Sequence, residues 1–248
     1  MRKPLLLALL LGLPFAASAQ QGAVRYDATV KLDIQLPPGM ENMADQIPSS
    51  QTSGRMLYFN ETATLMKDAP QAETDDGPVE IGGDGFRFRL DNRRPEQETW
   101  LSLEDGSMVE MRDFLGRKFR IAGEAPEYRW RLTGEQSEYL GYSCMKAVAE
   151  RDSSVVEAWF TPEIPVSAGP DGMGGLPGLI LVVSIDDGQR TFTATSVDLE
   201  TDISGLIVPP SDGRQVTRDE FDAIVEEKMK EMGATRDGRG GVRVMIRH

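Results

Sequence analysis

Residues 24–36 alternate between apolar and polar side chains without a break. A period of two places the apolar side chains on one face of a β-strand and the polar side chains on the other. Pro37-Pro38-Gly39 then ends the run. The segment therefore predicts a long strand with one buried face and one solvated face.

Further runs with strand character follow, separated by turn signals. Asp187-Gly188 between two such runs is typical of a β-hairpin. The succession favours an antiparallel meander over βαβ units. We predict a mainly β single domain, built as a curved antiparallel sheet or half-open barrel. The additional strands are expected at residues 57–65, 86–90, 98–103, 107–113, 117–122, 127–133, 139–149, 154–161, 178–186 and 189–199.

One helix is predicted near the end of the chain. Thr217-x-x-Glu220 is a capping box, and Gly233 is well placed to end the helix. Apolar residues then recur at helical spacing: Phe221, Ile224, Val225, Met229 and Met232. We expect an amphipathic helix that covers the open side of the sheet, although binding of a partner would use the same face.

The first nineteen residues have the pattern of a secretory signal peptide. Arg2 and Lys3 precede an apolar run, and Ala17-Ser18-Ala19 supplies a cleavage signal. The expected organisation is a signal peptide at 1–19, a β domain at 20–235 and a basic tail at 236–248. Residues 37–54 and 68–84 are expected to be long loops. The mature protein is predicted to be exported without a transmembrane segment, and to be periplasmic, outer-membrane-associated or secreted.

Composition excludes several classes of function. The chain has 27 basic and 40 acidic residues, so nucleic acid is not an expected partner. His248 is its only histidine and its last residue, which argues against Ser-His-Asp and Cys-His hydrolases and most zinc or copper sites. One cysteine cannot form an intramolecular disulfide. We predict no cofactor and no metal site.

Cys144 lies in a predicted strand, in which alternation places Tyr142 and Lys146 on the same side as the thiol. A free cysteine is most often a small buried apolar residue. The competing interpretation is a reactive thiol whose pKa is lowered by Lys146. A hydrolase that uses Cys144 or a pair of carboxylates is therefore kept as the alternative function.

The most distinctive segment is Gly174–Val183, which follows an extended stretch that contains Pro162 and Pro165. Leu176-Pro177-Gly178 suits a type II turn, and Leu179–Val183 is apolar on both faces, as in a central strand. We expect Trp130 and Trp159 to pack against that strand. The segment has two interpretations. It is either a loop with strict backbone requirements that leads into a core strand, or the rim of a binding cavity whose entrance it gates. The rim residues would be Trp159, Glu163, Gly174, Gly175, Leu176, Pro177 and Gly178.

Five ordered blocks carry a resemblance to a known family. They are 114–119, 130–132, 141–147, 158–165 and the stretch from Gly169-Pro170 to Leu181. Over about residues 110–185 the chain resembles the GLPGLI family of exported proteins, found mainly in Bacteroidetes. The family has no established activity, so the resemblance implies a compartment and a domain and no reaction. Trp130, Tyr142, Cys144, Lys146, Pro162 and Pro165 are expected to be structural residues of this motif.

These observations favour a non-catalytic binding or accessory protein of the periplasm or outer membrane. A curved sheet crossed by a helix can enclose an apolar cavity. The expected partners are a hydrophobic ligand, a peptide or an outer-membrane protein.

Overall fold

The structure is a computed structural model that describes residues 21–35, 48–70, 79–83, 86–90, 96–234 and 243–245. The predicted signal peptide lies outside the described residues, as does most of the predicted tail. Among the described residues one α-helix is present, α1 (Arg218–Ala234), with a 3-10 turn at Pro170–Gly172. The strands are β1 (Gly22–Lys31), β2 (Asp33–Gln35), β3 (Ser50–Phe59), β4 (Ala63–Asp68), β5 (Val79–Gly83), β6 (Phe86–Leu90), β7 (Gln97–Ser102), β8 (Ser107–Phe114), β9 (Arg117–Glu124), β10 (Arg131–Tyr139), β11 (Tyr142–Arg151), β12 (Ser154–Thr161), β13 (Leu179–Ile185), β14 (Arg190–Asp198), β15 (Arg214–Val216) and β16 (Arg243–Met245).

Twelve strands form one sheet in the order β10-β11-β12-β13-β14-β1-β3-β4-β7-β8-β9-β15. Two antiparallel meanders, β3-β4-β7-β8-β9 and β10-β11-β12-β13-β14, form the two arms of the sheet. They are joined because β1 pairs with both β3 and β14. The strand β15 pairs in parallel with β9 at one edge. The prediction of a mainly β, antiparallel fold with a C-terminal helix is thus confirmed.

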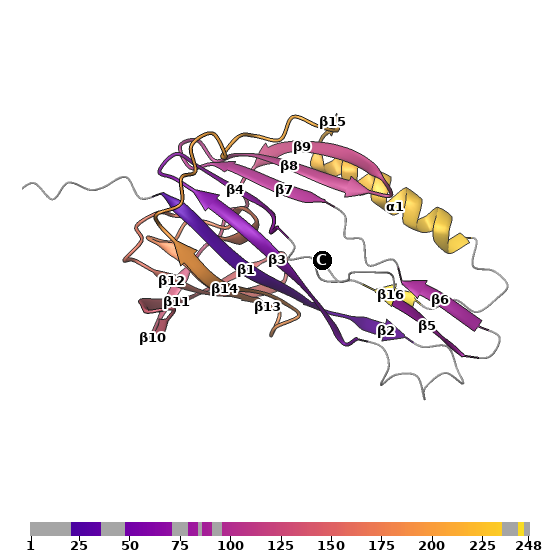
Figure 1. The fold of residues 1–248 in the computed structure, drawn as a ribbon, viewed down its shortest axis with the longest axis horizontal. Coiled ribbons are helices and arrows are strands. Elements are labelled where there is room, and N and C mark those ends of the chain that lie inside the picture. The colour runs from indigo at the N-terminus through magenta and orange to yellow at the C-terminus, as the bar shows by residue number, and fades with distance from the viewer. Residues whose placement is uncertain are drawn as a thin grey trace, which may run out of the picture.

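The connection between β9 and β10 shows that this sheet must curl. Six residues, 125–130, join these two strands, although nine other strands lie between them in the sheet. Ten strand spacings would separate the two by about 48 Å in a flat sheet. The connecting chain can span at most about 25 Å. The two arms therefore fold toward each other, as Figure 1 shows for β7–β9 above β10–β12.

The segment between β12 and β13 lies inside the curl and contacts strands of the other arm. The backbone N–H of Asp171 donates to Sδ of Met66 on β4, at 3.0 Å. At Gly172 a Cβ would lie 2.9 Å from Sδ of Met108 on β8. We call this segment, residues 162–178, the motif loop. It connects the two arms, and the face of the sheet that it contacts is called the inner face.

The main hydrophobic core lies between the motif loop and the strands around β1. Its fully buried members include Tyr26, Phe59, Phe160, Ile164, Leu179, Ile180, Leu181 and Phe192. Three successive residues of β13, Leu179 to Leu181, have no exposed side-chain surface. Because β13 also pairs with a strand on each side, the prediction of a central strand at Leu179–Val183 is confirmed, with Val182 alone of these five residues partly exposed.

The helix α1 begins as the sequence predicts. The N–H of Thr217 donates to Glu220 at 2.8 Å, and the N–H of Glu220 donates to Oγ1 of Thr217 at 3.2 Å. Phe221 packs edge-to-face on Phe119 of β9. Farther along the helix, Met229 is 54% exposed. The helix therefore covers the β9 edge of the sheet with its first turns, as Figure 1 also shows.

Some local predictions need correction. Residues 125–130 are not a strand, and β10 begins at Arg131, because these six residues cross between the arms without pairing. The predicted loop at 37–54 includes the first residues of β3, and the loop at 68–84 includes β5. No helix of the described residues is long and apolar enough to span a membrane.

Candidate functional site

The motif loop is held together by its own backbone and by glycines. At Gly178 a Cβ would lie 2.1 Å from the carbonyl oxygen of Thr161, so no other residue fits without moving the chain. The N–H of Gly178 donates to the carbonyl of Leu176 at 2.8 Å, which closes a three-residue turn around Pro177. Gly178 is absent from the residues with positive φ, whereas a type II turn would require one there. The predicted type II turn is therefore wrong, and Gly178 is needed for a close approach.

The seven predicted rim residues do not converge on one place. Leu176 is buried in the core, while Pro177 and Gly175 are exposed. Glu163 accepts a hydrogen bond from the N–H of Ser143 at 2.7 Å. Gly174 and Gly175 contact Trp130. Trp159 on β12 lies beside Lys146 on β11.

The predicted structural residues contribute packing and hydrogen bonds. Nε1 of Trp130 donates to the carbonyl of Gly174 at 2.8 Å, and its ring stacks on Tyr128. Tyr142 packs partly buried against the core. Pro162 and Pro165 are exposed residues of the motif loop.

Cys144 is a core residue, only 1% exposed. Burial raises the pKa of its thiol, and the charge of Glu163 adds to the effect. Lys146 is engaged elsewhere, with its Nζ 3.2 Å from Glu157, a contact that raises the pKa of Lys146. The alternative interpretation of Cys144 as a thiol activated by Lys146 is therefore wrong, because a buried neutral thiol is a poor nucleophile.

A cavity of about 490 Å³ lies on the inner face between the two arms. This volume falls in the usual range for ligand pockets. Met108, Ile121, Val156, Met173 and Ile185 give it apolar walls, and Tyr128 adds an aromatic ring. Its charged lining residues are Glu110, Arg112, Glu124, Arg151, Asp152, Asp171, Arg190 and Arg218.

Glu110 is the most buried of these charged side chains, at 4% exposure. Register places it on β8 between Thr99 and Ile121, so it points to the inner face. One oxygen accepts from Nε of Arg112 at 2.7 Å, and the other accepts from Arg218 at the start of α1. One buried carboxylate thus fixes two arginines and attaches the helix to the sheet.

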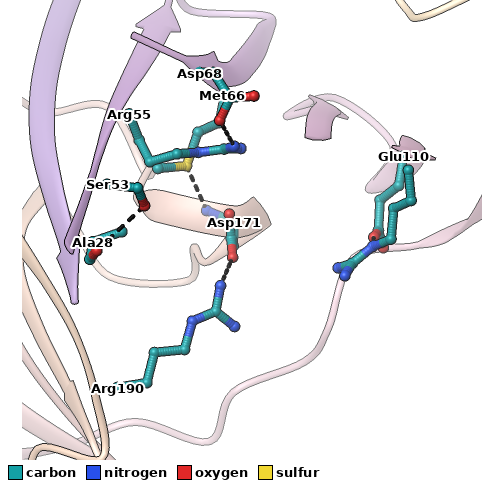
Figure 2. A network of polar contacts seen from close by, with 9 residues as sticks. Ala28, Ser53, Arg55, Met66, Asp68, Glu110, Asp171 and Arg190 are labelled. Carbon is teal, nitrogen blue, oxygen red and sulfur yellow. Dashed lines mark hydrogen bonds and ion pairs between the residues drawn. The ribbon is translucent and has the colours of Figure 1, made fainter. Parts of the chain in front are cut away.

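Asp171, which lies in the motif loop, is the second partly or fully buried acid of the cavity. Its backbone has φ +50°, in the left-handed region, and its carboxylate accepts from Arg190 on β14. The guanidinium of Arg190 also lies over the ring of Phe192, 4.7 Å from its centroid. Figure 2 shows the chain of contacts from Met66 through Asp171 to Arg190, with Glu110 apart from it.

Polar groups continue along the inner face beyond the cavity. Arg55 on β3 pairs with Asp68 on β4 at 2.5 Å, close to Met66 in Figure 2. Three buried polar atoms on this face find no hydrogen-bond partner among the described residues: Nη2 of Arg55, Nε2 of Gln97 and Oγ1 of Thr99. A buried polar group without a hydrogen-bond partner lowers the free energy of unfolding. The inner face is therefore more polar than stability requires.

Sequence reasoning allowed for an apolar cavity but missed the residues that line the observed one and their charges. None of the seven predicted rim residues is among those that line it. One signal was present, because Glu110 and Arg112 alternate with apolar residues in β8 and share a face with Met108. Asp171 and Arg190 gave no comparable signal, since only the curl brings them together. In the described residues no group of three or more His, Cys, Asp or Glu side chains is arranged to hold a metal ion.

Comparisons with known proteins give a family-model match around the motif loop and a likeness of fold. Residues 148–182 match a family model described as a protein of unknown function (Porph_ging). This match spans β12, the motif loop and the first half of β13, and the name GLPGLI stays a prediction. A comparison with curated protein sequences gives no match.

The fold is similar to part of PNGF-II. Its structure in space group P21 has a TM-score of 0.52 and 15% identity, over 83% of this chain and 33% of that chain. Its structure in space group C2 gives 0.53 and 16%, over 84% and 33%. The chain thus spans about a third of PNGF-II, and at this identity the likeness is one of fold.

Proposed function

We propose that this protein is an exported binding protein of the cell envelope, which holds a peptide-like ligand in the cavity between the arms. The supporting observation is the lining, in which arginines fixed by buried acids face apolar side chains. A ligand that matches this lining carries both polar and apolar groups. A lipid tail would desolvate the arginines and leave their remaining N–H groups without hydrogen-bond acceptors, which is unfavourable. Of the partners expected from the sequence, the peptide is therefore proposed as the ligand of the cavity, in preference to a purely hydrophobic ligand such as a lipid.

Binding is favoured over hydrolysis by the state of the candidate groups. The two most buried carboxylates of the cavity, Glu110 and Asp171, each accept hydrogen bonds from arginine. Both are therefore engaged in ion pairs within the protein, whereas a general acid or base must lie within hydrogen-bond reach of the reacting group. Cys144 lies in the core and is not among the lining residues.

Gly123 on β9 offers a direct test. It lines the cavity, its φ is not positive, and a Cβ there would meet nothing within 4 Å. Gly123→Phe should place a ring in the cavity, with no clash at its Cβ. Ser137→Phe on β10 is the matched control, because Ser137 is exposed and does not line the cavity.

The three full-length proteins would be purified from the native envelope and compared by native mass spectrometry. Wild type and Ser137→Phe are expected to carry a bound small molecule or peptide, and Gly123→Phe is expected to lose it. Bare protein in all three samples, or a ligand retained by Gly123→Phe, would reject the proposal.

A further inference from the structure

The charges of the cavity are unevenly paired. Counting the eight charged lining residues, four arginines balance four acids. Two of the acids, Glu124 and Asp152, are exposed, and Asp152 pairs with Arg151 at 3.3 Å. The other three arginines, Arg112, Arg190 and Arg218, pair with only two acids, Glu110 and Asp171, so this cluster carries one net positive charge. The whole chain has a net charge of −13, which makes this cluster unusual for the protein.

The three arginines of this cluster have N–H groups that no acceptor among the described residues uses. A guanidinium carries five N–H groups in a planar fork. Arg190 gives one Nη2 bond to Asp171, Arg218 gives one Nη2 bond to Glu110, and Arg112 gives its Nε to Glu110. Their side chains are 31–42% exposed, and all three line the cavity. The remaining N–H groups are therefore available to a ligand.

The acids hold these donors in place before a ligand arrives. Glu110 is 4% exposed and Asp171 is 13% exposed, so neither is free to reorient. Asp171 is held further by its backbone N–H, which donates to Met66. Fixed donors lose little conformational entropy on binding, which favours affinity.

We propose that this arginine cluster binds the free C-terminal carboxylate of a peptide whose last residue is apolar. Arginine forks match a carboxylate with two parallel hydrogen bonds. Met108, Ile121 and Met173 line the same cavity and would receive the apolar side chain next to that carboxylate. The inference rests on the proposed function, since it names the ligand of the same cavity.

The probe is a set of N-acetylated tripeptides that end in Leu, Phe or Val, together with the same peptides as C-terminal amides. Binding to the full-length protein would be measured by isothermal titration calorimetry at low salt. We expect the free acids to bind at least about tenfold more tightly than the amides, because a charge-assisted hydrogen bond is lost. Higher salt should weaken the free acids more than the amides.

Arg218→Gln is the informative variant, because Gln can still donate to Glu110 while the charge is lost. It should weaken the free acids about tenfold or more and leave the amides nearly unchanged. Arg120→Gln is the matched control on β9, since Arg120 bonds Gln215 and does not line the cavity. Arg190→Lys tests the fork separately, as it keeps the charge. Melting temperatures of all variants show whether the fold is intact.

The outcomes separate the two proposals. Equal affinity for acids and amides, or no effect of Arg218→Gln in a folded protein, overturns the carboxylate inference. Failure of every tripeptide to bind also overturns it, even if a ligand from the envelope is lost in Gly123→Phe. Full displacement of the peptides by an equal concentration of sulfate would overturn the assignment to a peptide. Failure of the Gly123→Phe experiment rejects the cavity as a binding site altogether.

Discussion

The phenol of Tyr26 donates a hydrogen bond of 2.5 Å to the carbonyl of Ile180. Tyr26 lies on β1 and Ile180 on β13, which are separated in the sheet by β14. Both side chains are fully buried. The bond thus joins the centre of the sheet to the strand that leaves the motif loop, inside the main core.

Tyr26→Phe should therefore destabilise the protein by about 1–3 kcal/mol, since it removes a buried hydrogen bond and no bulk. The measurement is urea unfolding followed by tryptophan fluorescence. Tyr139→Phe is the matched control, because Tyr139 makes a similar bond of 2.6 Å to Ala194 from a half-buried position. A loss no larger than that of the control would contradict the role given to Tyr26.

The same residue predicts how stability changes with alkaline pH. Burial raises the pKa of Tyr26, whereas the unfolded tyrosine titrates near pH 10. Above about pH 10 the unfolded chain loses this proton and the folded chain keeps it, so the free energy of unfolding falls as pH rises. Below that pH the contribution is fully present. Unfolding curves from pH 8 to pH 11 should show a shallower decline for Tyr26→Phe than for wild type.

Gly178 is expected to be intolerant of any side chain. Its Cβ would lie 2.1 Å from backbone oxygen, so Gly178→Ala must displace the motif loop or β12, at a cost of at least about 1–3 kcal/mol. Gly123→Ala is the matched control with open space around its Cβ, and it should be neutral or slightly stabilising. Thermal unfolding of both variants is the measurement. Equal melting temperatures would mean that the close approach at Gly178 is not a constraint.

The sequence predicts local structure well and the cavity poorly, for one physical reason. The strand at 154–161 and the capping box at Thr217 depend on neighbours in the chain, and both are observed as predicted. Alternation and capping are local signals. The site depends on the curl of the sheet, which brings Asp171 of the motif loop beside Arg190 and places Glu110 against Arg218. Those two pairs are separated by 19 and 108 positions, and nothing in the local pattern predicts them.

Cys144 should behave as a protected thiol. The folded protein at pH 8 is expected to react with iodoacetamide more than about 100-fold more slowly than the unfolded protein, because exposure of a core residue costs several kcal/mol. Burial raises the pKa of this thiol, so little thiolate is present at that pH while the core is closed. The rate would be followed by intact mass spectrometry with and without urea. A folded protein that is alkylated as fast as the unfolded one would place Cys144 at an accessible site.

Two buried threonines test the polar character of the inner face. Oγ1 of Thr99 finds no hydrogen-bond partner among the described residues, whereas Oγ1 of Thr161 accepts from the N–H of Glu163 at 3.2 Å. Thr99→Val should therefore raise the free energy of unfolding by about 1 kcal/mol, because it removes an unpaired buried hydroxyl at nearly constant volume. Thr161→Val should lower it by about 1–3 kcal/mol, since it leaves a donor without its acceptor. Chemical denaturation of the two variants gives both values. If Thr99→Val is as destabilising as Thr161→Val, the hydroxyl of Thr99 contributes to stability and the inner face is not polar in excess.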